Sequence, residues 1–572
     1  MPVGLLLISL GIIAAAWWWL ATPVTLAHAP IDPAAKLYCV SYAPFRGDQT
    51  PMNHELIVSP EQIEEDLTDL AKISQCVRTY SVDNGLDKVP ELAAKVGLKV
   101  LLGVWIGNEP RKNAFLADTA ISLANAYPGT VQAIIVGNEV LLRGEMTPAV
   151  LRETIRSVKA RVKIPVTYAD VWEYWLRYRE VAEDVDFVTI HVLPYWEDMP
   201  VRAEDAAAHV LAITKRVAVA FPGKEILIGE TGWPSNGRMR EGALPSRTNQ
   251  ARIVSEILDQ AKRENIRVNL IEAYDALWKR EWEGTVGGNW GLFDGVYRRL
   301  KYPAGIAISN YPFWKLQMES GMGLAVLVFA AAGLALRRRP RAPRLVCWIA
   351  VAVSATTAGI LLGVAADKMF YESYGIGRLL GWGSLLAAAI ASPVLCADAL
   401  MSGRALPTFQ ELIGPREGRI LSVPTMVLGF VLTLTTLLAG ETALGLLFDP
   451  RWRDFPFASL TMAVVPFWTL TQFNRPRSGA RPVAETAFAA LFGATALFAT
   501  FNEGFDNWQS LWTCAAYLLL GMTLYRARSV NVAEMSNIPI VVSDAASFRR
   551  DSAGSESDRS RAHADKDVVA PL

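Results

Sequence analysis

Seven hydrophobic blocks follow one another in the C-terminal part of the chain, and each is about as long as a membrane-spanning helix. An α-helix needs about 20 apolar residues to cross the hydrocarbon core of a bilayer. Buried helices of a soluble protein are the alternative, but seven such blocks in succession favour a transmembrane domain over residues 319–528. The predicted spans are approximately Ser320–Leu336, Leu345–Ala366, Leu379–Met401, Ile420–Phe448, Phe455–Phe473, Val483–Phe501 and Trp508–Tyr525.

A further apolar run, Gly4–Ala21, lies near the N-terminus and ends in three tryptophans that suit a bilayer interface. A secretory signal peptide is the alternative, because Ala27 and Ala29 form a small-x-small cleavage pattern. No basic residue precedes the run, however, and Pro30 directly follows the candidate cleavage site. We therefore favour an uncleaved transmembrane anchor within residues 1–30.

The composition excludes several classes of protein. Lys plus Arg and Asp plus Glu both number 56, so no net charge attracts the chain to nucleic acid. Hydrophobic residues make up 52%, which excludes a mainly disordered chain. The five cysteines and five histidines show no CxxC or HxxxH spacing. We therefore expect no nucleic-acid partner, no metal and no cofactor.

Basic residues alternate from one inter-span connection to the next, and this alternation predicts the orientation. The connection at residues 337–344 carries five arginines, whereas the next connection carries only Lys368 and Arg378. Arg-rich connections face the cytoplasm by the positive-inside rule. This predicts a multi-pass protein of the inner (cell) membrane with residues 36–312 on the periplasmic side. Residues 540–572 contain too few apolar side chains to form a folded core. Their composition predicts a disordered cytoplasmic tail.

Residues 36–312 contain eight short apolar runs separated by helix-length stretches. Runs that are apolar on both faces predict parallel strands with helical crossovers. Eight such repeats indicate a closed (β/α)8 barrel, and no GxGxxG or GxxxxGK motif supports the alternative of an open doubly wound sheet. The predicted fold class is an α/β TIM barrel followed by an all-α transmembrane bundle. The predicted strands are Leu37–Tyr42, Cys76–Tyr80, Lys99–Val104, Ala133–Gly137, Val166–Ala169, Phe187–His191, Ile226–Gly229 and Val268–Ala273.

Two glutamates end predicted strands in the same way. Glu139 follows the fourth strand and Glu230 the seventh. Barrel active sites lie at the C-terminal ends of the strands, so these carboxyl groups are expected to face each other at about 5 Å. Such a pair can break a glycosidic bond, with Glu139 protonating the leaving oxygen and Glu230 attacking the anomeric carbon. Burial and the charge of Glu230 are expected to raise the pKa of Glu139.

Aromatic residues gather near the same strand ends and favour a sugar-binding cleft. Sugar rings stack on aromatic faces through their C–H groups, and their hydroxyls need partners such as Asn138, Tyr42 and Lys279. We expect about half of the aromatic residues to contact sugar and the others to pack in the core. They are Trp105, Trp172, Trp175, Tyr195, Trp196, Trp233, Trp278, Trp282 and Trp290.

Residues 36–312 resemble glycoside hydrolase family 17, the retaining beta-1,3-glucanases and glucanosyltransferases. The segment Val136–Val140, which contains Asn138 and Glu139, resembles the acid/base motif of the family, and Gly229–Ser235 resembles its nucleophile motif. Supporting matches are Tyr38–Pro44, Arg78–Tyr80, Leu193–Tyr195, Glu272–Asp275 with Trp278 and Lys279, and Trp290–Phe293.

The resemblance implies a (β/α)8 fold with Glu139 as acid/base and Glu230 as nucleophile. Ala276 and Gly287 stand where plant members often carry acidic residues, so the acceptor side of the cleft is expected to differ from that of plant endohydrolases. The predicted substrate-binding residues are Tyr42, Asn138, Tyr168, Tyr195, Trp233, Glu272, Asp275, Trp278 and Lys279.

The predicted function is a membrane-anchored glucanosyltransferase that elongates or branches periplasmic or cyclic beta-glucan through a glycosyl-enzyme intermediate. The arrangement resembles bacterial membrane proteins of periplasmic or cyclic beta-glucan synthesis, so the expected partners are beta-glucan, the lipid bilayer and a membrane glucan synthase. The alternatives are an endo-beta-1,3-glucanase and a non-catalytic glucan-binding scaffold for the synthase. A transporter is disfavoured because Asp398 and Glu441 are the only notable ionisable residues near the spans.

Cys39 and Cys76 fall on adjacent predicted strands, and either a disulfide or two reduced core residues would fit there. We favour two reduced core residues. His191 ends the sixth predicted strand, where it either lines the cleft or lies hydrogen-bonded in the core.

Overall fold

The computed structural model describes residues 1–31, 35–302, 305, 307–337, 344–414, 421–474 and 479–528. All of them lie within one compact unit, Met1–Ser529. The predicted tail, residues 540–572, lies outside the described residues. So do several arginines of the predicted cytoplasmic connections, namely Arg338, Arg339, Arg341, Arg416, Arg419, Arg475 and Arg477.

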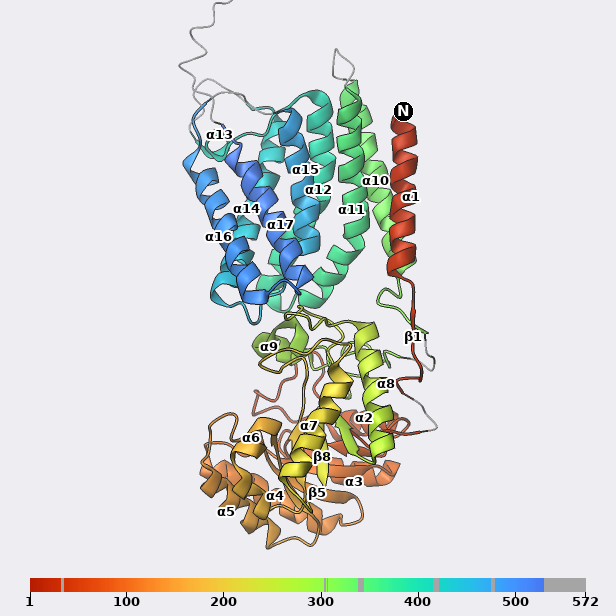
Figure 1. Cartoon of the computed structure of the whole chain (residues 1–572), viewed down its shortest axis with the longest axis vertical. Coiled ribbons are helices and arrows are strands. Elements are labelled where there is room, and N and C mark those ends of the chain that lie inside the picture. Colours follow the sequence, from red (N-terminus) through yellow and green to blue (C-terminus); the bar gives the residue numbers. More distant parts are fainter. Residues whose placement is uncertain are drawn as a thin grey trace, which may run out of the picture. The chain divides into compact units, whose positions relative to one another are not determined.

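Eight parallel strands form a closed barrel in which each strand pairs with its neighbour in sequence and the last pairs with the first (Figure 1). The predicted barrel is therefore confirmed, and every predicted strand overlaps an observed one. The strands are β2 (Cys39–Ser41), β3 (Cys76–Arg78), β4 (Lys99–Val104), β5 (Val131–Asn138), β6 (Val166–Val171), β7 (Val188–His191), β8 (Ile226–Thr231) and β9 (Arg267–Leu270).

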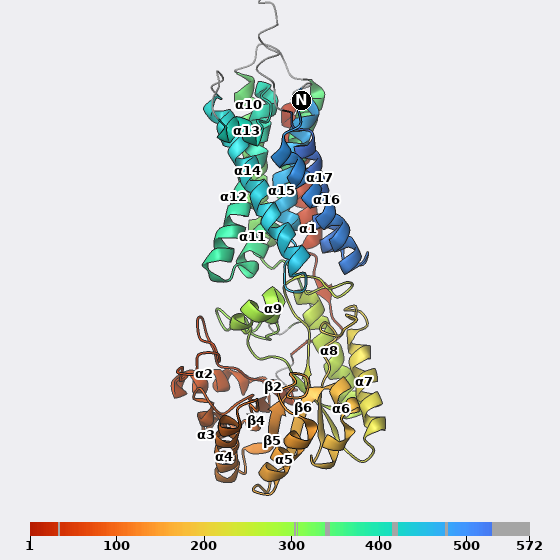
Figure 2. The same ribbon diagram turned by 90° about the vertical axis from the view of Figure 1, so that its left-hand side faces the viewer.

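Helices surround the barrel, and their first residues follow standard capping chemistry (Figure 2). Ser59, Thr147 and Ser246 each accept a hydrogen bond from the backbone N–H three residues later, and proline follows the first two. The helices are α2 (Pro60–Leu70), α3 (Val89–Val96), α4 (Pro110–Ala126), α5 (Pro148–Lys159), α6 (Trp172–Arg177), α7 (Ala206–Ala220), α8 (Arg247–Glu264) and α9 (Arg280–Gly287), with short 3₁₀ turns at η1 (Leu86–Lys88), η2 (Arg179–Glu183) and η3 (Leu277–Lys279).

Cys39 and Cys76 are joined in a disulfide between neighbouring strands β2 and β3. The prediction of two reduced core residues is therefore wrong. Both cysteines are almost completely buried in an apolar cluster with residues of five other strands or strand ends, including Leu101 and Leu227. Sequence position placed the two residues on adjacent strands, but it could not show that their side chains point towards each other.

The C-terminal part is helical, and every predicted span corresponds to a helix. Of the described helices, six are long and apolar enough to cross a membrane: α1 (Pro2–Leu20), α10 (Trp314–Leu336), α11 (Leu345–Glu372), α12 (Gly375–Ser402), α14 (Val423–Phe448) and α16 (Val483–Glu503). The other two predicted spans are α15 (Phe457–Phe473) and α17 (Trp508–Tyr525), which have 17 and 18 residues. A short helix, α13 (Phe409–Ile413), precedes α14.

Two predicted spans thus fall short of the length and composition of the other six. Helix α15 is short, and α17 carries buried polar residues such as Gln509, Ser510 and Thr513. Helix α15 packs against α11, α12 and α17 and is buried along most of its length. The apolar side chains of α15 and α17 therefore serve packing between helices as much as contact with lipid.

Helix α1 packs against α10 and α11 through small residues. A Cβ atom on Gly359 of α11 would lie 2.4 Å from the side chain of Ile13, and one on Gly363 would lie 2.5 Å from the ring of Trp17. Trp17 is completely buried and meets Tyr311 edge-on at 5.4 Å. This packing joins α1 to the helical bundle, and the uncleaved anchor stays a prediction.

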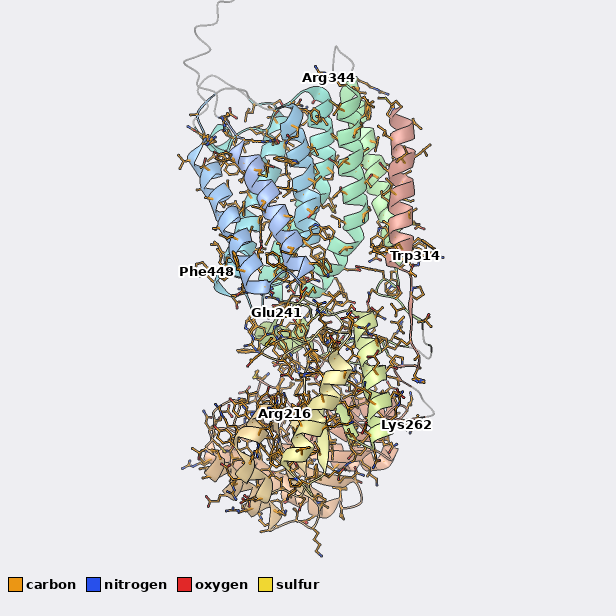
Figure 3. The ribbon with its side chains drawn as sticks, viewed as in Figure 1. Arg216, Glu241, Lys262, Trp314, Arg344 and Phe448 are labelled. Atoms are coloured by element: carbon orange, nitrogen blue, oxygen red, sulfur yellow. A yellow bond between two sulfur atoms is a disulfide. The ribbon has the colours of Figure 1, made fainter. Side chains whose placement is uncertain are left out.

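The segments that enter and leave the barrel pair with each other. Strand β1 (Val24–Thr25) follows α1, and strand β10 (Ala307–Ile308) precedes α10; the two form a small antiparallel sheet. Arg344, at the start of α11, lies at one end of the helical bundle, whereas Trp314 and Phe448 lie at the other (Figure 3). The N-terminus of α1 lies at the same end of the bundle as Arg344 (Figure 1).

The Cys39–Cys76 disulfide predicts that replacing both cysteines by alanine lowers the thermal stability of the full-length protein. A cross-link over 37 residues restricts the unfolded chain and is typically worth about 2–4 kcal/mol. Non-reducing peptide mapping should recover the two cysteines in one cross-linked species. Recovery of both as free thiols, with the double variant melting at the same temperature as the unchanged protein, would refute the cross-link.

Candidate active site

The polar residues at the centre of the site come from the C-terminal ends of four barrel strands. Arg78 ends β3, Asn138 ends β5 and is followed by Glu139, His191 ends β7, and Glu230 lies one residue before the end of β8. Parallel strands in a closed barrel bring these ends to the same mouth. The strand ends therefore assemble the site that the sequence predicts.

The backbone near both glutamates explains the glycines that precede them. Gly137 has a φ of +89° and Glu139 a φ of +54°, so the chain turns through the left-handed region as it leaves β5. At Gly229, which precedes Glu230, a Cβ atom would lie 2.4 Å from the Thr189 methyl carbon. The backbone before each glutamate therefore fixes the direction of its side chain, and Gly137 and Gly229 tolerate little substitution.

Glu139 and Glu230 face each other across the mouth. One carboxylate oxygen of each, together with a ring nitrogen of His191, lies within 4.8 Å of the other two. Retaining glycosidases hold their carboxyl groups about 5–5.5 Å apart, whereas inverting enzymes need about 6.5–9.5 Å to admit a water molecule. The predicted proximity is confirmed, and the two oxygens lie closer than the spacing that inverting enzymes need.

Glu230 is buried and held by two donors. Its Oε1 accepts hydrogen bonds from Arg78 Nη1 at 3.2 Å and from the Tyr80 hydroxyl at 2.8 Å, and only 5% of the residue is exposed. Arg78 also donates to the Gly229 carbonyl at 2.7 Å and to Asn138 Oδ1 at 2.6 Å. The guanidinium therefore places a positive charge against the Glu230 carboxyl group and links that group to the residue beside Glu139.

Glu139 lies against His191, whose Nδ1 is 2.7 Å from Glu139 Oε1. Burial acts to raise the pKa of Glu139, but the hydrogen bond and charge of His191, helped by Arg78 and Arg143, lower that pKa below its usual value. The predicted rise in the pKa of Glu139 is therefore wrong for the sugar-free site. The strand pattern placed His191 near the site, but it could not show that the ring contacts this carboxylate.

The side chains of Glu139, His191 and Glu230 are also a set that could hold a metal ion by type and distance. The arginine already bound to Glu230 argues against this interpretation. Arg78 Nη1 lies 3.2 Å from the Glu230 oxygen and 3.3 Å from His191 Nε2, so a cation there would meet a fixed positive charge. The same atoms fit a sugar anomeric centre, which develops positive charge only in the transition state.

A cavity of about 870 Å³ opens at this mouth, and both glutamates and His191 line it. Six of the nine aromatic residues considered for sugar contact line the cavity: Trp105, Trp172, Trp196, Trp278, Trp282 and Trp290. The other three, Trp175, Tyr195 and Trp233, are buried elsewhere. The volume and the aromatic walls suit several sugar rings in a row.

A second polar pair lies on the wall that follows β9. Lys279 Nζ donates to Glu272 Oε2 at 3.0 Å, and both residues line the cavity. Burial raises the pKa of Glu272 to about 7, although Lys279 opposes the rise. Glu272 Oε1 and the ring nitrogen of Trp278 are buried without a hydrogen-bond partner. These polar atoms are available for the hydroxyl groups of a substrate.

The predicted substrate-binding residues divide into two groups. Lining the cavity are Tyr42, Asn138, Glu272, Trp278 and Lys279, whereas Tyr168, Tyr195, Trp233 and Asp275 do not line it. Those four are buried in structural contacts instead: Tyr168 donates to Asp170, Tyr195 to the Arg238 carbonyl, and Trp233 to the Leu244 carbonyl, while Asp275 accepts from Lys301. They shape the walls from behind rather than facing a sugar.

Sequence reasoning assigned no role to several residues that the structure brings to the site. Arg78 and Tyr80 belong to a segment that supports the family resemblance. Their position at the end of β3 is the signal that could have revealed their role. Glu283 of α9 also lines the cavity, and burial raises the pKa of its carboxyl group. Arg451 and Trp452 line it from the connection between α14 and α15, for which no local signal exists.

A (β/α)8 barrel with two carboxyl groups at this separation is the arrangement of a retaining glycoside hydrolase. Comparison with known families agrees. Residues 39–291 match the family model of the BtgE/BtgC glycoside hydrolase domain.

Several known proteins are similar to the barrel region. The chain is 30% identical over 225 residues to the "Probable beta-glucosidase btgE" of Aspergillus fumigatus, which covers 38% of this chain and 39% of that protein. It thus spans about two fifths of that relative. It is 27% identical over 268 residues to a "Glucan 1,3-beta-glucosidase" of Candida albicans, covering 42% of this chain and 84% of that protein.

Among solved structures, the chain is similar to an active-site mutant of the Rhizomucor miehei beta-1,3-glucanosyltransferase in complex with laminaritriose. The identity is 26%, the TM-score is 0.42, and the match covers 48% of this chain and 97% of that one.

The buried contacts of Arg78 predict a large loss of stability when its charge is removed. Replacement by methionine leaves the buried Glu230 carboxylate without its guanidinium partner, which typically costs about 3–5 kcal/mol. The melting temperature of full-length Arg78→Met in detergent should therefore fall clearly below that of the unchanged protein. Arg156→Met is the matched control, because Arg156 pairs with Asp184 at the surface. Equal melting of both variants would contradict the buried ion pair.

Proposed function

We propose that this protein is a membrane-anchored retaining enzyme that acts on beta-1,3-glucan and transfers glucosyl chains to other glucans. The observation that carries the proposal is the pair of carboxyl groups, Glu139 and Glu230, within 4.8 Å of each other at the mouth of the barrel. The names of the relatives support beta-1,3-glucan as the substrate class.

In the first step Glu230 attacks the anomeric carbon and forms a glycosyl ester, while protonated Glu139 donates its proton to the departing glycosidic oxygen. Arg78 and Tyr80 favour the attacking carboxylate because both donate to Glu230 Oε1. The released part of the glucan leaves with a new hydroxyl group, and Glu139 remains as a carboxylate beside His191.

In the second step Glu139 acts as a base and accepts a proton from the incoming hydroxyl group, whose oxygen displaces Glu230 from the anomeric carbon. Water as the acceptor gives hydrolysis, and a sugar hydroxyl gives a longer or branched glucan. The aromatic lining of the cavity favours a stacked sugar acceptor over water. Anchoring beside newly exported glucan favours the same outcome, in which periplasmic or cyclic beta-glucan is elongated or branched.

Six helices apolar enough to span a membrane support the proposed inner-membrane location, with residues 36–312 as the periplasmic enzyme domain and residues 319–528 as the membrane domain. The disulfide within the barrel supports an oxidising compartment for that domain. A membrane glucan synthase is the partner whose product such an enzyme would modify. The non-catalytic scaffold is less well supported, because the ion-paired Glu230 and the cavity are both intact.

The test is product analysis with the full-length protein in detergent or nanodiscs and linear laminari-oligosaccharides as substrate. The proposal predicts products longer than, or branched relative to, the starting sugar, identified by mass spectrometry and linkage-resolving NMR. Glu230→Gln should lower turnover by roughly a thousandfold or more while sugar binding persists. The matched control is Glu281→Gln, on an exposed position of α9 outside the cavity, which should retain turnover.

Only shorter sugars at high donor concentration would overturn transfer in favour of the endo-beta-1,3-glucanase alternative. Unchanged turnover in Glu230→Gln would rule out that residue as the nucleophile. Binding of glucan by the unchanged protein without any turnover would favour the scaffold.

The contact between His191 and Glu139 predicts a shift in the pH dependence of kcat/KM. Glu139 must be protonated to donate to the leaving oxygen, so activity falls as pH rises through the pKa of Glu139. Removing His191 takes away a hydrogen bond and a charge that favour the ionised form, and the pKa of Glu139 rises. His191→Ala should therefore extend the alkaline side of the profile to higher pH.

The control for this experiment is His191→Asn, whose amide can still donate a hydrogen bond but carries no charge; its profile should shift less than that of the alanine variant. An alkaline limb that stays in place or moves to lower pH in His191→Ala would contradict the role given to this contact.

A further inference from the structure

The connection between α14 and α15 contributes to the wall of the sugar cavity. Arg451 and Trp452, in the segment of residues 449–456, line the same cavity as Glu139 and Glu230. This segment belongs to the helical bundle by sequence and lies outside the residues that match the glycoside hydrolase family. The bundle therefore supplies part of a cavity whose reacting groups come from the barrel.

Trp452 extends a row of aromatic rings that the barrel begins. The rings of Trp196 and Trp290 stack at 6.4 Å with an interplanar angle of 18°, and Trp452 meets Trp196 at 5.6 Å and 64°. The guanidinium of Arg451 lies 4.8 Å from the centre of the Trp452 ring. An indole beside a guanidinium offers a face for the C–H groups of a sugar and donors for its hydroxyls.

Buried contacts hold this segment against the barrel. The Thr285 hydroxyl donates to Asp454 Oδ2 at 2.7 Å, and both residues are buried. Gly284 has a φ of +69°, and a Cβ atom there would lie 2.8 Å from the Trp452 carbonyl oxygen. The Arg238 guanidinium lies 4.8 Å from the centre of the Phe455 ring. The segment is thus positioned by the barrel side chains that surround it.

The neighbouring connection, between α16 and α17, makes contacts of the same kind. Arg238 forms a buried ion pair with Glu503. Asn507 Nδ2 donates to the Met239 carbonyl at 3.0 Å, and the Met239 N–H donates to Gln509 Oε1 at 2.9 Å. Buried polar contacts of this kind are costly to break one at a time. They fix two bundle connections against the same face of the barrel.

Trp452 takes no part in the hydrogen bonds around the reacting groups. The partners of Glu139 and Glu230 described above are His191, Arg78 and Tyr80, whereas the ring contacts of Trp452 are with Trp196 and Arg451. A sugar on Trp452 would therefore meet groups other than those that hold the two reacting carboxyl groups.

We propose that Trp452 and Arg451 form a binding subsite for a glucosyl unit remote from the cleaved bond. The inference rests on the proposed function, and its ligand is a beta-1,3-glucan chain long enough to reach from Glu139 and Glu230 to Trp452. The membrane domain then has a second role besides anchoring, because it completes the binding site. Chains that reach the subsite are used better than chains that do not.

The test compares laminaritriose with laminarihexaose as donor for the full-length protein in detergent. In Trp452→Ala the ratio of kcat/KM for laminarihexaose to that for laminaritriose should fall by roughly three- to tenfold, the size expected from the loss of one ring-stacking contact. The loss should appear mainly in KM. Trp452→Phe, which retains an aromatic face, should recover most of the ratio.

Phe448→Ala is the matched control, because this residue is at the end of the same connection, is 84% exposed and does not line the cavity. It should leave the ratio unchanged. Arg451→Ala is the second variant should Trp452→Ala fail to fold, since Arg451 is exposed, and it should also lower the ratio.

Equal losses for the two donors in the variants, or no loss at all, would overturn the subsite. A ratio that falls as much in Phe448→Ala would overturn it too, because the effect would then come from the connection as a whole. Failure of the proposed function is distinguishable, since the unchanged protein would then turn over neither donor.

Discussion

The ion pair between Arg78 and Glu230 is the interaction on which the site depends. A carboxylate buried to this degree carries a large desolvation cost unless a charged donor accompanies it. Arg78 meets that need and, by also binding Asn138 and the Gly229 carbonyl, ties the ends of three strands together. The ends of these three strands therefore stay together although the buried Glu230 carboxylate lies between them in a low-dielectric environment.

The repeat pattern was sufficient to predict the barrel. Runs apolar on both faces and spaced by helix lengths have few other solutions, and the two glutamates followed because strand ends converge. What the pattern lacked was side-chain direction. Tyr168, Tyr195, Trp233 and Asp275 lie on or soon after barrel strands, as Tyr42 and Asn138 do, yet they turn into the packing behind the cavity.

Electrostatics and long-range contacts were the least predictable features. The pKa of Glu139 depends on one ring nitrogen of His191, which is 52 residues away in sequence and reaches the carboxylate only through the closed fold. The disulfide depended on the relative direction of two side chains on neighbouring strands. Arg451 and Trp452 come from a connection that hydropathy assigns to the membrane domain, so no reading of the barrel segment alone could include them.

The pairing of β1 with β10 has a consequence for how such a chain can diversify. The two ends of the barrel segment leave it side by side, next to α1 and α10, which themselves pack together. The barrel is therefore a single insertion between α1 and α10, and the pairing of β1 with β10 holds its two ends together. A different domain with adjacent termini could replace the barrel at β1 and β10 without altering the order of the helices that follow.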